Sequence, residues 1–111
     1  MNVKFEEKEK KLTIEITEEI DHHVVEKIRG KLDDEIIRYM PRKVVFDFIN
    51  VTFMDSAGIG MILGRYKIVK MIGGNMEMKN VSPILKKIFE MSGITNICKI
   101  YNKEDKSINA Y

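Results

Sequence analysis

The sequence has little of what many functional classes require. Its 111 residues contain one cysteine, Cys98, two prolines and no tryptophan. A single cysteine excludes an internal disulfide and is typical of a reducing compartment. No segment approaches the roughly 18 consecutive apolar residues of a membrane-spanning helix, and the start lacks the apolar core of a signal peptide. We therefore expect a cytoplasmic protein that does not enter a membrane.

The sequence also lacks an excess of charge of one sign. Lysine and arginine total 19 against 17 aspartates and glutamates, a formal net charge of +2. The two signs are interspersed, as in residues 6–11 and 33–38, which is typical of solvated surface. Nothing resembles the basic stripe of a nucleic-acid-binding protein, so we expect no direct contact with nucleic acid.

Ligand patterns for metals and nucleotides are missing as well. His22 and His23 are adjacent, so on a helix they point about 100° apart and would not chelate one metal ion together. No cysteine or histidine cluster has zinc-ligand spacing, and we expect no metal site. The glycines at 58, 60 and 64 do not form a dinucleotide fingerprint, because its third glycine would fall at Leu63. No cofactor is expected.

What the sequence does contain is an alternation of strand and helix patterns. Alternating or apolar β-forming runs predict strands near 3–5, 11–17, 44–49, 75–79 and 97–101, the third of them covered on both sides. Helical periodicity with start and stop signals predicts helices from Asp21 to Pro41, from Ser56 to Gly73 and from Ser82 to Gly93. The order β-β-α-β-α-β-α-β predicts one α/β domain over 1–111 with a mixed sheet, ending in a weakly structured tail or a short helix at 102–111.

The most informative stretch is Phe53-Met54-Asp55-Ser56-Ala57-Gly58-Ile59-Gly60, where a strand's exit passes into a helix. We interpret Ser56 as the N-cap, whose hydroxyl lies beside backbone N–H groups that no helical carbonyl satisfies. Such a position can present a hydroxyl to a partner and can tolerate a phosphate group. A hydrolase nucleophile is disfavoured, because the nucleophile elbow requires glycine where Met54 stands.

Two interpretations remain open for Gly60 and Gly64. They are four residues apart, so they stack on one side of the helix and leave it smooth. The smooth face can pack closely on the sheet or can form a flat docking surface for a partner.

The motif from Phe53 to Gly60, followed by Ile62-Leu63-Gly64-Arg65-Tyr66-Lys67, resembles the signature of the STAS domain. More narrowly, it is similar to the bacterial anti-sigma factor antagonists of the sporulation type. The segments Glu19-Ile20-Asp21-His22-His23, Ile72-Gly73-Gly74 and Phe89-Glu90-Met91-Ser92-Gly93 agree with that family in order. The resemblance implies a small mixed sheet with helices mainly on one face.

The resemblance also implies partner switching without enzymatic activity. The unmodified protein would bind an anti-sigma factor that is a serine kinase, and the sigma factor would be released. That kinase, which carries the ATP, would phosphorylate Ser56, and a PP2C-type phosphatase would reverse the modification. Ala57 replaces a second hydroxyl residue found in many relatives, and Glu18 replaces a glycine. The residues expected to contact the partner are Asp21, Asp55, Ser56, Ala57, Gly58, Gly60, Met61, Gly64 and Arg65.

We expect the phosphate to act on the surface rather than on the fold, because Asp21 and Asp55 would repel it in the docked complex. Two alternatives remain: a ligand-binding STAS domain, and a scaffold STAS domain of another signalling assembly. A receiver domain phosphorylated on an aspartate is a weaker alternative, because the first strands do not end in a buried carboxylate cluster that could hold Mg²⁺.

Overall fold

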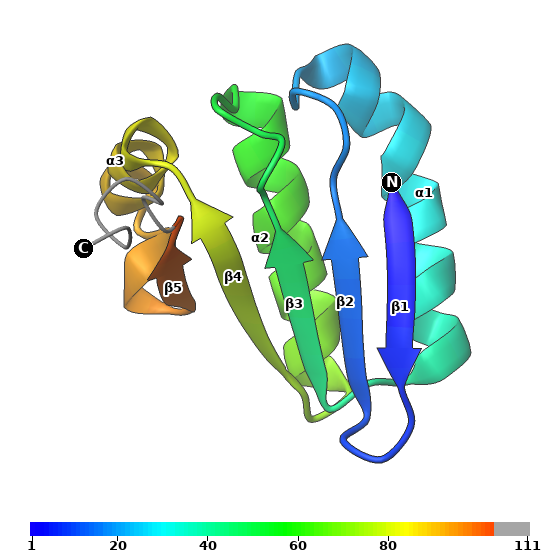
Figure 1. Ribbon diagram of the computed structural model, residues 1–111. Helices are drawn as coiled ribbons and strands as arrows, with labels where there is room; N and C mark the ends of the chain where they lie inside the picture. Colours follow the sequence, from blue (N-terminus) through cyan, green and yellow to red (C-terminus); the bar gives the residue numbers. More distant parts are fainter. Residues whose placement is uncertain (104–111) are drawn as a thin grey trace, which may run out of the picture.

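The computed structural model describes residues 1–103 and shows the predicted order of strands and helices (Figure 1). A short 3₁₀ helix, η1, precedes the last strand. The elements are β1 (Asn2–Glu6), β2 (Lys11–Glu15), α1 (His22–Tyr39), β3 (Lys43–Asp47), α2 (Ser56–Met71), β4 (Asn75–Val81), α3 (Pro83–Ser92), η1 (Ile94–Asn96) and β5 (Lys99–Asn102).

The five strands form one mixed sheet in the order β1-β2-β3-β4-β5. β1 and β2 form an antiparallel hairpin, whereas β2 to β5 are mutually parallel. Each parallel step needs a crossover, and α1, α2 and α3 supply the three crossovers. The predicted fold class is therefore confirmed. The carboxyl ends of β2, β3 and β4 meet at one edge of the domain, where α1, α2 and α3 begin (Figure 1).

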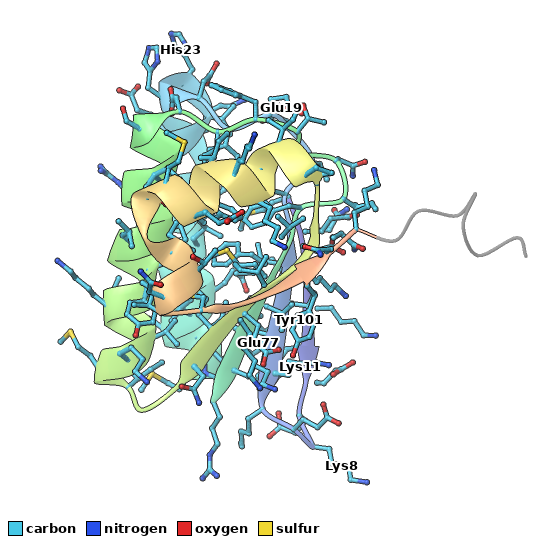
Figure 2. The ribbon with its side chains drawn as sticks, turned by 90° about the vertical axis from the view of Figure 1, so that its left-hand side faces the viewer. Lys8, Lys11, Glu19, His23, Glu77 and Tyr101 are labelled. Carbon is cyan, nitrogen blue, oxygen red and sulfur yellow. The ribbon has the colours of Figure 1, made fainter. Side chains whose placement is uncertain are left out.

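The helices cover one face of the sheet and leave the other open, as Figure 2 shows from the side. Alternate strand residues point toward the helices, because successive side chains of a strand lie on opposite faces. On β2, β3 and β4 they form the centre of the core: Leu12, Ile14, Val44, Phe46, Met76 and Met78. α1 adds Val25, Ile28, Leu32 and Ile36 at helical spacing.

The open face corrects one prediction, that β3 is covered on both sides. Val45 points away from the helices and lies in register between Thr13 and Glu77. It is nevertheless only 7% exposed. A salt bridge between Lys43 and Glu77, 3.4 Å long, crosses this face beside it. Long charged side chains can cover apolar surface with their stems, so an apolar run here does not require a second helical layer.

The last strand begins later than predicted. Ile97 and Cys98 are not in a strand, because their N–H groups donate to the Ile94 carbonyl at 3.1 and 3.0 Å and close the η1 turn. The strand then runs from Lys99 to Asn102, so Asn102 belongs to the sheet rather than to the predicted tail. The rest of that tail prediction, at 104–111, lies outside the described residues.

Candidate functional site

The start of α2 differs from the prediction by one residue. Asp55, not Ser56, is the N-cap: its backbone is extended, with φ −86° and ψ −178°, and its Oδ1 accepts the Gly58 N–H at 3.0 Å. Both side chains are good caps, and the carboxylate occupies the position because its second oxygen has a further partner. Ser56 is therefore the first helical residue, and its side chain is exposed.

The loops that precede α1 and α2 lie side by side at the carboxyl edge of the sheet (Figure 1). Ile20 and Met54 form a parallel β-bridge, and the Asp55 N–H donates to the Ile20 carbonyl at 3.3 Å. Asp55 Oδ2 also accepts the His22 N–H at 3.1 Å. One carboxylate thus satisfies N-terminal N–H groups of both helices and fixes the two helix starts to each other.

Glu19 joins the same two loops and was missed in the sequence analysis as a functional residue. Its carboxylate accepts the Thr52 N–H at 2.9 Å, the Phe53 N–H at 2.9 Å and the Thr52 hydroxyl at 3.1 Å. Charge-assisted bonds of this kind are stronger than neutral ones. No spacing rule could have found this contact, because Glu19 and Thr52 are 33 residues apart.

Gly58 packs against the bridge between the loops. A Cβ atom at this position would come within 2.4 Å of Met54 Cγ and 2.7 Å of Ile20 Cγ2. Only glycine lets the first turn of α2 approach the bridge this closely. Gly58 therefore fixes the depth of the helix start and does not face a partner as predicted.

The outer side of α2 carries Ser56, Gly60 and Gly64, which stack at intervals of four. A Cβ atom at Gly60 or Gly64 would meet nothing within 4 Å. Close packing on the sheet, one of the two interpretations offered for these glycines, is therefore wrong. Ala57, beside Ser56, is half-buried and packs against the core.

Met61 and Arg65 lie on the inner side of α2, which corrects their predicted place on the docking surface. Met61 is 3% exposed and Arg65 is 8% exposed. The Arg65 Nε lies 2.8 Å from Asp33 Oδ1, so an ion pair joins α2 to α1. Lys67, which follows Gly64 on the next turn of α2, is exposed.

Asp21 is the N-cap of α1, as predicted, and its Oδ1 accepts the Val24 N–H at 3.0 Å. This hydrogen bond lowers the pKa of the Asp21 carboxyl, and the nearby His23 N–H lowers it further. Asp21 is exposed and lies one residue from each of Ile20 and His22, which contact Asp55. The structure thus brings Asp21 to the edge that carries Ser56.

Comparison with known proteins agrees with this architecture. A family model described as "STAS domain" matches residues 2–107. The chain belongs to the STAS domain family. The resemblance noted in the sequence is confirmed at this level.

Relatives of this STAS domain include the anti-sigma F factor antagonist of Paenibacillus polymyxa. It is 38% identical over 84% of this chain and 80% of the relative. The solved structure of the anti-sigma factor antagonist SpoIIAA in its unphosphorylated form has a TM-score of 0.73 at 30% identity, covering 92% of this chain and 88% of that one. The phosphorylated form of the Bacillus cell fate determinant SpoIIAA has a TM-score of 0.65 at 30% identity, with coverage of 92% and 91%.

The histidines beside the site of this STAS domain are exposed, and their rings lie against each other with centroids 3.9 Å apart. The helical angle alone did not predict this contact. Within residues 1–103, no group of three or more metal-ligating side chains could hold a metal ion. No helix in that same part of the chain is long and apolar enough to cross a membrane.

Proposed function

We propose that this STAS domain is an anti-sigma factor antagonist controlled by phosphorylation of Ser56. In its unmodified form it binds an anti-sigma factor that is also a serine kinase, and this binding releases the sigma factor. The kinase carries the ATP and transfers the terminal phosphoryl group of ATP to the Ser56 hydroxyl. A PP2C-type phosphatase restores the active form, and the antagonist itself catalyses nothing.

The observation that carries this proposal is the exposed hydroxyl at the first position of a helix whose cap is another residue. Asp55 makes the capping bond to Gly58 and the bond to His22, so Ser56 is free of any capping role. A phosphoryl group on Ser56 would remove none of these bonds. The helix N-terminus also favours a negative charge. The modification is therefore compatible with an unchanged fold.

Release of the partner then follows from electrostatics at the surface. A phosphate adds about −1.5 to −2 charges at neutral pH. Asp21, Glu19 and Asp55 already place carboxylates on the two loops at this edge. Docking a partner would desolvate the phosphate next to these groups, and a loss of about 3–4 kcal/mol lowers affinity by two to three decades.

The outer side of α2 suits a docking surface. Gly60 and Gly64 leave the backbone uncovered behind Ser56, and Lys67 follows on the next turn. Each interior glycine costs roughly 0.5–1 kcal/mol relative to alanine. Since neither glycine is needed for packing within the domain, close approach by a partner is the benefit that we infer.

The relatives support the same assignment. The P. polymyxa relative is named an anti-sigma F factor antagonist, and SpoIIAA has been solved in unphosphorylated and phosphorylated forms. These names motivate the choice of an anti-sigma factor as the partner of this chain, and the phosphorylated form of SpoIIAA motivates a partner that is also a kinase. A place in sporulation is part of this proposal and follows from the resemblance noted in the sequence.

The test is to incubate the purified protein with ATP and the anti-sigma factor of the same organism, and to map phosphate by mass spectrometry. We expect one phosphorylated peptide, modified at Ser56, and none in Ser56→Ala. A retained small ligand and no kinase binding would favour a ligand-binding STAS domain instead. Modification of another residue in the wild type would show that the acceptor is wrongly assigned.

A further inference from the structure

Phe53 is an exposed aromatic side chain three residues before Ser56. The chain has five phenylalanines, all within residues 1–103. Phe46, Phe48 and Phe89 are fully buried, and Phe5 stacks on Tyr39 with ring centroids 4.4 Å apart. Phe53 alone among the five is more than half exposed, at 57%. Among residues 1–103, Phe53 is not one of the hydrophobic side chains that pack against the core.

The backbone of Phe53 is nevertheless firmly held. Its N–H donates to Glu19 Oε2 at 2.9 Å. The preceding residue, Thr52, donates its N–H and its hydroxyl to the same carboxylate. The following residue, Met54, is 2% exposed and pairs with Ile20. An exposed side chain on a fixed backbone loses little freedom when it is buried by a partner.

Binding energy in protein interfaces is concentrated in a few large side chains, aromatic ones above all, that enter pockets of the partner. Phe53 has this chemistry and precedes the modifiable hydroxyl of Ser56 by three residues. It lies on the loop that leads into α2, two residues before the N-cap Asp55.

We propose that Phe53 is the apolar anchor of the docking surface that carries Ser56. In this proposal Glu19 is a positioning residue, because it fixes the backbone of Phe53 before the partner binds. The inference rests on the proposed function, since the partner is the anti-sigma factor kinase that receives Ser56. It adds that the kinase carries an apolar pocket beside the site where Ser56 docks. Phosphorylation of Ser56 would then add charge to the interface with the kinase and leave the apolar contact of Phe53 unchanged.

The experiment measures the affinity of unphosphorylated full-length variants for the anti-sigma factor of the same organism, by titration calorimetry. Phe53→Ala should weaken binding about 30- to 100-fold. The matched control is Tyr101→Ala, which removes an aromatic of similar exposure, 49%, from the open face of the sheet (Figure 2). This control should bind as the wild type does. Phe53→Leu should recover most of the affinity that alanine loses.

Glu19 is tested with Glu19→Gln, and Glu18→Gln serves as its control because Glu18 pairs with Lys27 at 3.3 Å and holds no loop. Glu19→Gln should speed hydrogen exchange at the Thr52 and Phe53 amides and weaken binding about three- to tenfold, since one acceptor oxygen is replaced by a donor. In the Phe53→Ala background, Glu19→Gln should leave the affinity for the anti-sigma factor almost unchanged, because the anchor that Glu19 positions is already absent.

The outcomes separate this inference from the proposed function. If the wild type neither binds the kinase nor is phosphorylated by it, the proposed function fails. If the wild type binds and Phe53→Ala binds equally well, the anchor is wrong and the proposed function stands. If Glu19→Gln costs the same affinity with and without Phe53, Glu19 does not act through the anchor. With the anchor correct, Phe53→Ala raises KM for phosphorylation of Ser56 and leaves kcat unchanged.

Discussion

The two sides of α2 differ in their surroundings: one side is buried within the domain and the other is open. The inner side is packed within the domain: Gly58, Met61 and Arg65 are buried against the loop bridge, the core and α1. The outer side carries Ser56 and Gly60, whose surroundings are open. One helix of 16 residues therefore has a side that maintains the fold and a side that is available to a partner.

This difference suggests how a covalent switch can work without a conformational change. The bonds that fix the helix start belong to Asp55 and Glu19, and neither depends on the Ser56 hydroxyl. A charge can thus be added to the outer side while the inner side is undisturbed. Substitutions on the two sides should separate binding from stability.

The largest expected effect is on binding, from Ser56→Asp. The added carboxylate imitates part of the phosphate charge, so affinity for the anti-sigma factor kinase should fall by about 100-fold. The free energy of unfolding, measured in urea, should stay within about 0.5 kcal/mol of the wild type. Ser56→Ala is the control and should bind normally. Equal affinity for Ser56→Asp would contradict the electrostatic account.

Arg65→Ala should have the next largest effect, and on stability alone. It breaks the ion pair with Asp33 and opens space between α1 and α2. The Asp33 side chain is 31% exposed and can be hydrated when Arg65 is removed. We therefore expect the free energy of unfolding to fall by about 2 kcal/mol, which is less than the cost of breaking a fully buried pair. Lys67→Ala, on an exposed site of the same helix, should leave the urea midpoint unchanged. A stable Arg65→Ala protein with weak binding would place Arg65 on the docking surface after all.

Gly58→Ala tests the close approach at the start of α2. The new Cβ would lie 2.4 Å from Met54 Cγ and must displace a buried side chain. Overpacking of this kind costs about 1–3 kcal/mol, which exceeds the gain in helix propensity. Thermal unfolding should therefore show a lower midpoint.

Gly60→Ala sharpens the contrast, because it is the same substitution two residues later with the opposite expected sign. The added Cβ meets nothing within 4 Å, so helix propensity should stabilise the protein by about 0.5–1 kcal/mol. Affinity for the kinase should fall, since the added methyl group prevents close approach. A variant that is more stable and binds as well as the wild type would remove the glycines from the docking surface.

The smallest expected effect is a pH dependence from Asp21. Its pKa is lowered in the folded protein, chiefly by the Val24 N–H. The stability it contributes is therefore fully present above the ordinary carboxyl pKa and is lost as pH falls toward the lowered value. Asp21→Ser keeps a cap that does not titrate, so its urea midpoint should fall less than that of the wild type between pH 6 and pH 3. Parallel curves for the two proteins would show that the Asp21 cap does not contribute.

Local signals in the sequence were sufficient for most of the fold. Asp21 before α1, and Ser82 followed by Pro83 before α3, were predicted as helix starts, because capping depends on neighbouring residues. The start of α2 was predicted one residue late, because Asp55 and Ser56 are both good caps. Only the contact of Asp55 with His22, from another loop, distinguishes them.

Contacts between distant segments were beyond the reach of the sequence. In the sequence Glu19 is one acidic residue among several. Its carboxylate can hold the second loop only because the fold brings Thr52 and Phe53 beside it. Met61 and Arg65 were placed on the wrong side of α2 because apolar residues occur around the whole helix and its periodicity is weak. The family resemblance identified the motif correctly but did not show which of its side chains face outward.

The most direct test of the central claim compares the protein phosphorylated on Ser56 with the unmodified protein. Amide chemical shifts report the fold, and calorimetric titration with the anti-sigma factor kinase reports binding. We predict shift changes confined to the loops around 19–22 and 52–55 and to the first turns of α2, together with a loss of affinity of about 100-fold or more. Unchanged affinity, or shift changes that spread through the sheet, would contradict a switch that acts through surface charge.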